Sequence, residues 1–156
     1  MRWIVTYRRL IFATPLLAGC VIFESRSTNL LADLADNRAV WEAAGLTDYT
    51  MQFQRQCLFC PTDLITPVEL TVRDDVIEAV FDLELQVPRT EWQEGDYLTV
   101  TELFDTIQDA IDLQAAEIKI RYDGTLGYPA EINIDFNRRF VDDDIDVVVQ
   151  DVMPLN

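Results

Sequence analysis

Cys57 and Cys60 form a Cys-x-x-Cys pair, the spacing with the clearest potential for chemistry in this sequence. Such a pair acts as a redox centre when its first thiolate lies at a helix N-terminus, where the helix dipole and backbone amides lower the thiol pKa. Here an alternating strand pattern precedes the pair, and the segment 61–67 contains two prolines and predicts no helix. The surrounding negative charge would also raise a thiol pKa. We therefore expect a structural disulfide at a strand end, with a thiol-disulfide redox protein as the alternative.

Asp142, Asp144 and Asp146 are alternating carboxylates of the type that opens a calcium-binding loop. An EF-hand would also need glycine at position 147 and glutamate at position 153, where the sequence has Val147 and Met153. The three aspartates are therefore weak metal candidates, and a solvated acidic loop is the favoured interpretation. A calcium-dependent or inhibitor-type binding module is a further alternative, because so acidic a domain would attract a cation or a basic partner by electrostatic steering.

The segment 122–129, with the sequence YDGTLGYP, contains the candidate binding residues Tyr122, Asp123 and Tyr128. Aromatic rings beside a fixed carboxylate are common in recognition surfaces. Ordinary turn chemistry explains the same residues, because its glycines permit positive φ angles and its tyrosines can pack against or cap a hairpin. We favour the turn and keep the three residues as a candidate binding loop.

The composition argues against several enzyme chemistries. The chain has no histidine, so a Ser-His-Asp or Cys-His nucleophile and a His-ligated zinc or haem are excluded. Lys119 is the sole lysine, and Ser25 and Ser27 are the only serines, which argues against a Ser-Lys or P-loop mechanism. Its 28 acidic residues against 12 basic ones also argue against a nucleic-acid partner, which needs clustered Lys and Arg. We predict no catalytic residue and no cofactor.

Residues 1–19 have the features of a lipoprotein signal peptide. Arginines at positions 2, 8 and 9 precede the apolar run 10–17, which is far shorter than the roughly 20 residues of a membrane span. The run ends in Leu17-Ala18-Gly19-Cys20, which is similar to the bacterial lipobox. In a lipobox, the cysteine sulfur receives a diacylglyceryl group, the preceding peptide is cut off, and the new amine is acylated. We therefore expect lipidation at Cys20.

Several acyl chains at Cys20 would anchor the protein to a membrane almost permanently. The next residue is Val21 rather than aspartate, which by resemblance to the Gram-negative sorting rule implies the outer membrane. Cleavage would remove three arginines and no carboxylate, so the net charge would fall from −16 to −19. We expect a protein of the bacterial cell envelope that faces the periplasm, where another envelope protein is a possible partner.

The elements that would position these residues can be read from hydrophobic periodicity. The patterns predict a helix over 29–44, strands over 49–57, 68–72 and 76–83, a loop over 84–98, a helix over 99–111, and strands over 118–122, 132–136 and 145–152. Thr99 and Glu102 have the spacing of a capping box at the start of the second helix. With 20–28 as a tether, residues 29–156 form a single α+β domain. We expect an antiparallel sheet of about six strands with two helices packed on one face, in the order α-βββ-α-βββ.

The mature chain resembles a bacterial family. The residues that carry the resemblance are Trp41-x3-Gly45-x2-Asp48-Tyr49, the Cys57/Cys60 pair before Pro61, and Tyr122-Asp123-x3-Gly127-Tyr128-Pro129 with Asp135. Together they resemble the bacterial domain of unknown function numbered 6174, whose members look like secreted or lipid-anchored proteins. The resemblance implies no particular activity, cofactor or catalytic residue. One departure is Asp74-Asp75, at a turn where Asp-Gly is expected. The combined expectation is a non-enzymatic, lipid-anchored envelope protein that acts as a binding or structural module.

Overall fold

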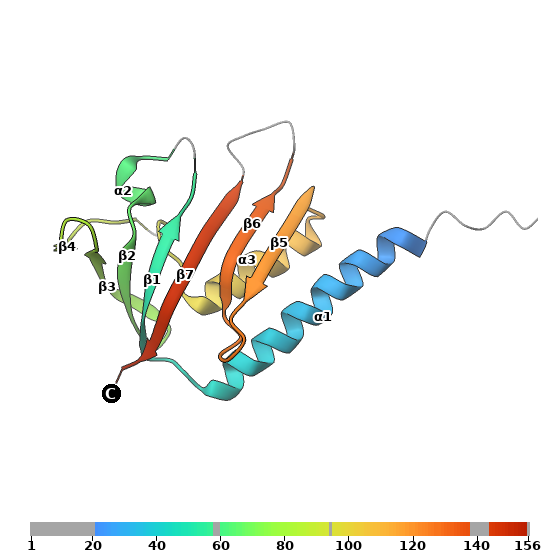
Figure 1. The fold of residues 1–156 in the computed structure, drawn as a ribbon, viewed down its shortest axis with the longest axis horizontal. Coiled ribbons are helices and arrows are strands. Elements are labelled where there is room, and N and C mark those ends of the chain that lie inside the picture. Colours follow the sequence, from blue (N-terminus) through green and yellow to red (C-terminus); the bar gives the residue numbers. More distant parts are fainter. Residues whose placement is uncertain (1–20, 58–59, 94, 138–143, 156) are drawn as a thin grey trace, which may run out of the picture.

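The chain folds around a seven-stranded antiparallel sheet (Figure 1). The computed structural model describes residues 21–57, 60–93, 95–137 and 144–155, with side chains from Asn29 onward. Its strands are β1 (Tyr49–Arg55), β2 (Val68–Arg73), β3 (Val76–Asp82), β4 (Val87–Arg89), β5 (Glu117–Tyr122), β6 (Pro129–Asp135) and β7 (Ile145–Pro154). Its helices are α1 (Val21–Ala44), α2 (Thr62–Ile65) and α3 (Val100–Asp112).

The strand order is β4-β3-β2-β1-β7-β6-β5, so the first and last strands meet in the middle of the sheet. Strands β1 to β4 form one meander, α3 crosses over, and β5 to β7 form a second meander that returns to β1. The β1–β7 pairing places Phe53 opposite Val149. Two backbone hydrogen bonds extend this pairing beyond the strands, from Gln56 to Asp146 at 2.9 Å and from Leu155 to Asp48 at 3.0 Å. The two halves of the sheet are therefore joined only when the C-terminal strand is in place.

The antiparallel α+β class is confirmed, but the prediction of about six strands is wrong. The segment 84–98, expected as a loop, contains β4. Three residues with Pro88 in the middle cannot show an alternating pattern, so the sequence hides this strand. The short helix α2 also lies in the segment 61–67, where no helix was predicted.

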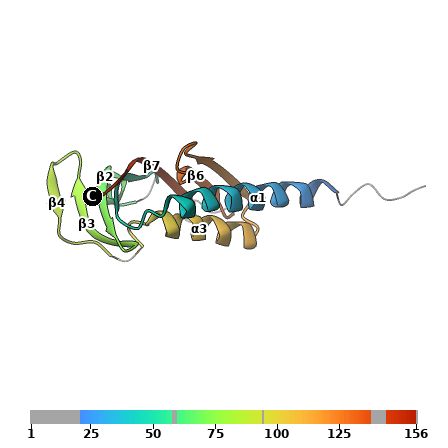
Figure 2. The ribbon, with the colours of Figure 1, turned by 90° about the horizontal axis from the view of Figure 1, so that it is seen from below.

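The prediction of two helices on one face of the sheet is also wrong. Helix α3 lies across the sheet, while α1 packs beside α3 and runs out past the β5 edge (Figures 1 and 2). From Asn29 onward, α1 has only two buried side chains, Leu34 and Trp41, whereas α3 has six. So narrow an apolar stripe is sufficient for contact with another helix but not for covering a sheet. Helix α1 also begins at Val21 rather than Asn29, so the segment expected as a tether is helical. None of the described helices is long and apolar enough to cross a membrane.

Helix α3 supplies one wall of the core. Its buried side chains pack against the inner face of the sheet, and they are Val100, Leu103, Phe104, Ile107, Ala110 and Ile111. The predicted capping box is present: the Thr99 hydroxyl accepts from the Glu102 amide at 3.3 Å, and the Thr99 amide donates to Glu102 Oε2 at 2.7 Å. These bonds satisfy free amides of the first turn and fix where the helix begins.

The turn between β2 and β3 forms at Asp74 and Asp75, where a tight turn was expected. Both residues have positive φ angles, 46° and 60°, as the two central residues of a type I′ hairpin require. The Asp74 amide donates to Asp48 Oδ1 at 2.9 Å, and the Asp75 amide donates to the Thr47 carbonyl at 3.2 Å. Aspartate tolerates the left-handed conformation because its short polar side chain imposes a smaller penalty than most. An Asp-Gly pair is therefore not needed here.

The loop between β5 and β6 is the place where α1 docks on the sheet. Gly127 has a φ of +74°, and a Cβ atom at this position would lie 2.5 Å from the Asn37 carbonyl oxygen and 3.0 Å from Val40 Cβ. The backbone of the loop therefore touches the helix directly, and only glycine fits this contact.

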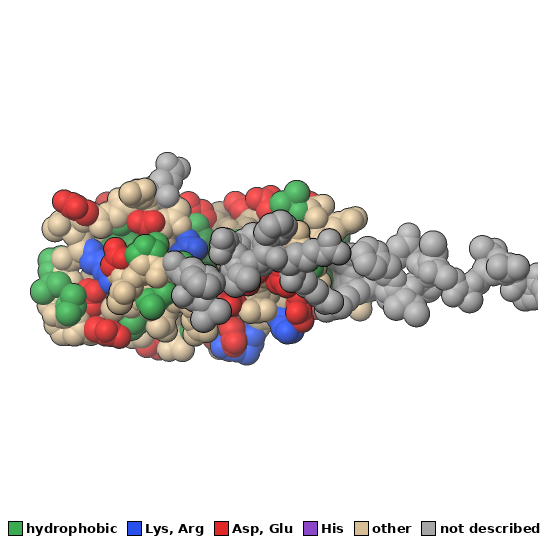
Figure 3. Space-filling view, turned by 90° about the horizontal axis from the view of Figure 1, so that it is seen from above, with side chains coloured by type: hydrophobic (Ala, Val, Ile, Leu, Met, Phe, Trp, Pro, Cys, Tyr) green, Lys and Arg blue, Asp and Glu red, His purple; other side chains and the backbone are tan. Residues whose placement is uncertain are grey.

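The surface is strongly acidic, as the net charge of −16 requires. On the face shown in Figure 3, carboxylates are spread over the molecule and Lys and Arg occupy only a few places. Hydrophobic side chains are visible at the left-hand end of this view.

We expect Gly127→Ala to lower the free energy of unfolding by about 2–4 kcal/mol, because alanine is strained at positive φ and its methyl group would clash with α1. Urea denaturation followed by circular dichroism measures the loss. Gly124→Ala is the matched control, since nothing lies within 4 Å of a Cβ at that position. Equal effects of the two substitutions would show that the loop does not dock on α1.

Candidate functional site

The candidate binding loop uses its own polar groups to hold its shape. Asp123 Oδ1 accepts from the amides of Thr125 and Leu126 at 2.9 and 2.7 Å. The Asp123 amide donates to the Tyr128 carbonyl at 2.9 Å, and the ring of Tyr128 is buried. The Asp123 carboxylate is therefore engaged inside the turn, which favours the turn interpretation over a recognition loop.

Tyr122 belongs to the packing of the helices rather than to an exposed loop tip. Its ring stacks on Phe104 of α3 with centroids 6.3 Å apart, and the Arg38 guanidinium lies 5.1 Å from the Phe104 centroid. Burial raises the pKa of Tyr122 to about 12, so its hydroxyl stays neutral at physiological pH. The ring of Tyr122 joins β5 to α3, and Arg38 of α1 contacts the same Phe104 ring.

Cys57 and Cys60 are bonded to each other, with their Cα atoms 5.6 Å apart. The bridge closes the segment between β1 and α2, just before the N-cap residue Pro61 of α2. Gln54 Nε2 donates to the Ile65 carbonyl at 3.1 Å, which holds α2 against β1 from its other end. This position supports a structural role for the disulfide.

Two of the three weak metal candidates, Asp144 and Asp146, lie within the described residues. Asp142 lies outside the described residues, and Asp144 immediately precedes β7. Asp146 accepts a hydrogen bond from the Asn133 side chain on the neighbouring strand. Within the described segments, no three His, Cys, Asp or Glu side chains are grouped so that they could hold a metal ion.

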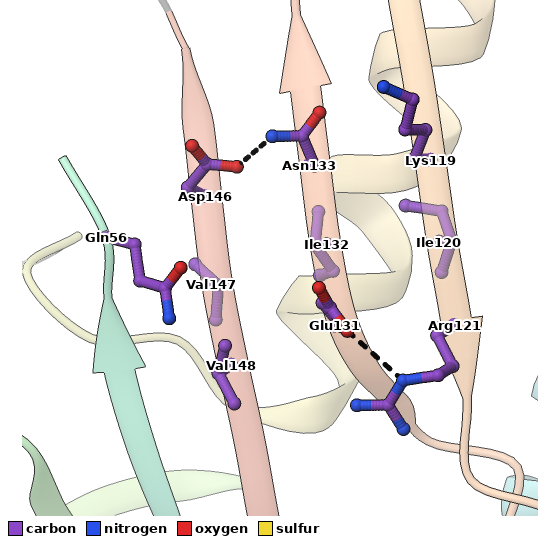
Figure 4. A pocket seen from close by; sticks show the side chains of 10 residues that line it. All are labelled: Gln56, Lys119, Ile120, Arg121, Glu131, Ile132, Asn133, Asp146, Val147 and Val148. Carbon is purple, nitrogen blue, oxygen red and sulfur yellow. Dashed lines mark hydrogen bonds and ion pairs between the residues drawn. The ribbon is translucent and has the colours of Figure 1, made fainter.

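A polar hollow of about 440 Å³ lies on the face of the sheet that α3 leaves uncovered (Figure 4). We call it the sheet-face hollow. It is lined by residues of β5, β6, β7 and the end of β1, namely Gln56, Lys119, Ile120, Arg121, Glu131, Ile132, Asn133, Asp146, Val147 and Val148. Strand pairing brings its polar side chains into register, with Lys119 opposite Asn133 and Asn133 opposite Asp146.

The charged groups of the sheet-face hollow are paired across strands or along them. Arg121 Nε lies 3.1 Å from Glu131 Oε2, and Lys119 Nζ lies 2.7 Å from Glu117 Oε1. The side chains of Arg121 and Glu131 are 60% and 57% exposed, so water screens their attraction and the pair adds at most about 1 kcal/mol to stability. The hollow therefore offers cationic donors and anionic acceptors, and engaging Arg121 or Glu131 with a ligand would cost the domain little stability.

Sequence reasoning did not find this hollow. Its signal is the alternation of polar residues along two strands, at Lys119 and Arg121 of β5 and at Glu131 and Asn133 of β6. The alternation alone does not show that β6 pairs with β7, because the connection between these strands, residues 136–144, is too long to fix a register as a tight turn does.

A second hollow, of about 580 Å³, lies at the opposite edge of the sheet, and we call it the β4-end hollow. It is lined by Thr62, Asp63, Thr66, Asp82, Glu84, Leu85, Val87, Pro88, Arg89, Thr90 and Glu91. Its base is an ion pair between Asp82 and Arg89, with Arg89 Nη2 2.7 Å from Asp82 Oδ2 and side chains only 3% and 13% exposed. Arg89 also donates to the Tyr97 hydroxyl at 3.0 Å and to the Asp63 carbonyl.

Asp82 has no unused hydrogen-bonding capacity that would suit acid-base chemistry. Its Oδ1 accepts from the amides of Leu85 and Glu84 at 2.8 and 2.9 Å, while its Oδ2 accepts from Arg89. The hydrogen bond from the Leu85 amide, together with Arg89, keeps the pKa of Asp82 below its ordinary value. The carboxylate is thus a structural anion that shapes the β3–β4 turn.

Residues 33–154 match the model of DUF6174, a family of unknown function. The chain belongs to this family. The DUF6174 match runs from within α1 to the last residue of β7 and includes the disulfide and both hollows, which confirms the resemblance seen in the sequence. Cys20 precedes the DUF6174 region. No curated protein and no solved structure matches the chain.

We expect Asp82→Asn to destabilise this DUF6174 domain at pH 7 and its effect to shrink in acid. Because the folded-state pKa of Asp82 is depressed, its contribution is present above the ordinary aspartate pKa of about 4 and is lost as pH falls through the lower folded-state value. Thermal unfolding of the wild type and of Asp82→Asn, measured from pH 7 down to pH 2, gives the stability of each protein as a function of pH. The control is Asp105→Asn, which breaks an exposed pair with Arg38. Parallel curves for wild type and Asp82→Asn at all pH values would contradict this role.

Proposed function

We propose that this DUF6174 protein is a non-enzymatic, lipid-anchored protein of the bacterial cell envelope that acts as a binding module. Its anchor is Cys20, and its domain faces the periplasm from the outer membrane. The signal-peptide pattern, the lipobox and Val21 after the cysteine support this location.

The sheet-face hollow is the observation that carries the binding role. It is open, lined by donors and acceptors, and lies on the side of the sheet that α3 does not cover. Acid-base or nucleophilic catalysis needs a positioned nucleophile or proton-transfer group whose pKa suits the reaction. Lys119, Arg121 and Asp146 each have a partner within the domain, an arrangement suited to polar recognition.

Helix α1 supports the anchored arrangement. Its 24 described residues, Val21–Ala44, are about 36 Å of helix and reach back to the neighbour of Cys20. Its N-terminal part runs out beyond the β5 edge (Figure 1). A lipid at Cys20 would therefore be joined to the domain by a helical arm, and β4 would lie at the far edge of the sheet from the anchor.

We expect cells grown with labelled palmitate to incorporate the label into the wild-type protein and not into Cys20→Ser. The reason is that Cys20 carries both the thioether and the acylated amine after cleavage. Gel detection of the label and outer-membrane fractionation measure the result, and mass spectrometry identifies the lipid. The control is Cys57→Ser/Cys60→Ser, which keeps Cys20 and the label. An unmodified wild-type chain would contradict the anchor.

Binding at the sheet-face hollow is tested by placing a photo-crosslinking amino acid at Arg121 in intact cells. We expect discrete crosslinked species from this position, because its side chain points into the hollow (Figure 4). The same amino acid at the exposed Asp109 of α3 is the control. Equal crosslinking from both positions, or substrate turnover by the purified protein that a substitution abolishes without unfolding it, would contradict a binding module.

A further inference from the structure

The β4-end hollow combines exposed apolar side chains with unpaired carboxylates. Leu85 and Val87 are 72% and 46% exposed, although both are aliphatic. Asp63, Glu84 and Glu91 are exposed on the lining of the same hollow. Among the described residues, no Lys or Arg side chain forms an ion pair with these three carboxylates.

Arg89 is the one cation among the described residues that line this hollow, and it does not neutralise the three carboxylates. Arg89 directs its guanidinium to Asp82, and the two charges cancel at the base of the hollow. The rim therefore retains the negative charge of three carboxylates beside an apolar surface. A ligand that fits such a rim has positive charges next to aliphatic groups.

We propose that the β4-end hollow docks a basic, apolar segment of a partner protein. This proposal rests on the proposed function as a binding module and names the chemistry of one partner. Lys or Arg side chains of the segment would meet Asp63, Glu84 and Glu91, and its aliphatic side chains would cover Leu85 and Val87. Burial of exposed aliphatic area drives such contacts, while the charges set the orientation and the choice of partner.

The position of the hollow suits a protein partner. Strand β4 lies at the edge of the sheet farthest from β5, beyond which α1 extends (Figure 1). Hydrophobic and acidic side chains are visible side by side at this end of the molecule (Figure 3). Pro88 has no amide hydrogen, so β4 lacks a donor at its middle residue. We therefore infer that the partner is recognised through side chains rather than by adding a strand to the sheet.

The overall acidity of the chain does not by itself produce this specificity. A net charge of −16 attracts basic molecules to every face. A test of the β4-end hollow must therefore compare two positions whose side chains are equally exposed to solvent. Leu113, at the end of α3, is 71% exposed, against 72% for Leu85, and it lies outside the hollow. These two leucines are a matched pair.

The test uses the full-length protein in intact cells, with a photo-crosslinking amino acid at Leu85 or at Leu113. We expect a protein adduct from Leu85 and not from Leu113, and we expect mass spectrometry to identify a crosslinked segment that is net positive and contains aliphatic residues.

Glu84→Gln/Glu91→Gln should lower the Leu85 adduct about tenfold, because rim charges control the rate of encounter with the partner. Asp109→Asn/Asp112→Asn changes the net charge equally but lies on α3, so it should change the adduct by less than about twofold. Circular dichroism of the purified variants verifies that each is folded.

Absence of an adduct at Leu85, an acidic or uncharged crosslinked segment, or an adduct to lipid would overturn the proposal. Equal losses from the two pairs of charge substitutions would also overturn it, since they would indicate attraction by the whole acidic surface. These outcomes are separate from the proposed function, which is tested at Cys20 and Arg121. A labelled protein that crosslinks at Arg121 but not at Leu85 would refute only the docking surface at β4.

Discussion

The fold depends most on Tyr49, the first residue of β1. Its side chain is completely buried, and its hydroxyl accepts a hydrogen bond from the amide of Val100 at 3.0 Å. Its ring meets Trp41 of α1 edge-on, with centroids 5.3 Å apart. Burial raises the pKa of Tyr49 well above its ordinary value, so the hydroxyl remains neutral. One residue thus ties the central strand to the end of α1 and the beginning of α3.

The position of β1 explains how the two hollows come to lie on different halves of one sheet. Strand β1 pairs with β2 on one side and with β7 on the other. The meander from β1 to β4 carries the β4-end hollow, and the meander from β5 to β7 carries most of the sheet-face hollow. The two surfaces differ in chemistry. The charged side chains of the sheet-face hollow have partners within the domain, while no Lys or Arg in the described part of the chain forms an ion pair with Asp63, Glu84 or Glu91. A single small domain therefore carries two separate hollows of different chemistry.

Local interactions made much of the fold predictable. The capping box at Thr99, the hairpin turn at Asp74 and Asp75, and the disulfide between Cys57 and Cys60 each involve residues only a few positions apart. The long strands were equally predictable, because apolar and polar residues alternate along them. The start of α1 was not, because the serines, threonine and asparagine at 25–29 have only modest helix propensity. Strand β4 and helix α2 were missed since each is too short to produce a period.

The amino-acid sequence by itself determined the α+β class, the family, the bonded cysteines and the chemistries excluded by a chain without histidine. Only the tertiary structure decided the strand order, the placement of α1 beside α3, and the two hollows. The physical reason is the range of the interactions involved. Caps, turns and alternation are local, whereas the pairing of Phe53 with Val149 joins residues from opposite ends of the domain. A surface assembled from distant strands depends on their pairing and register, which no single position of the sequence predicts.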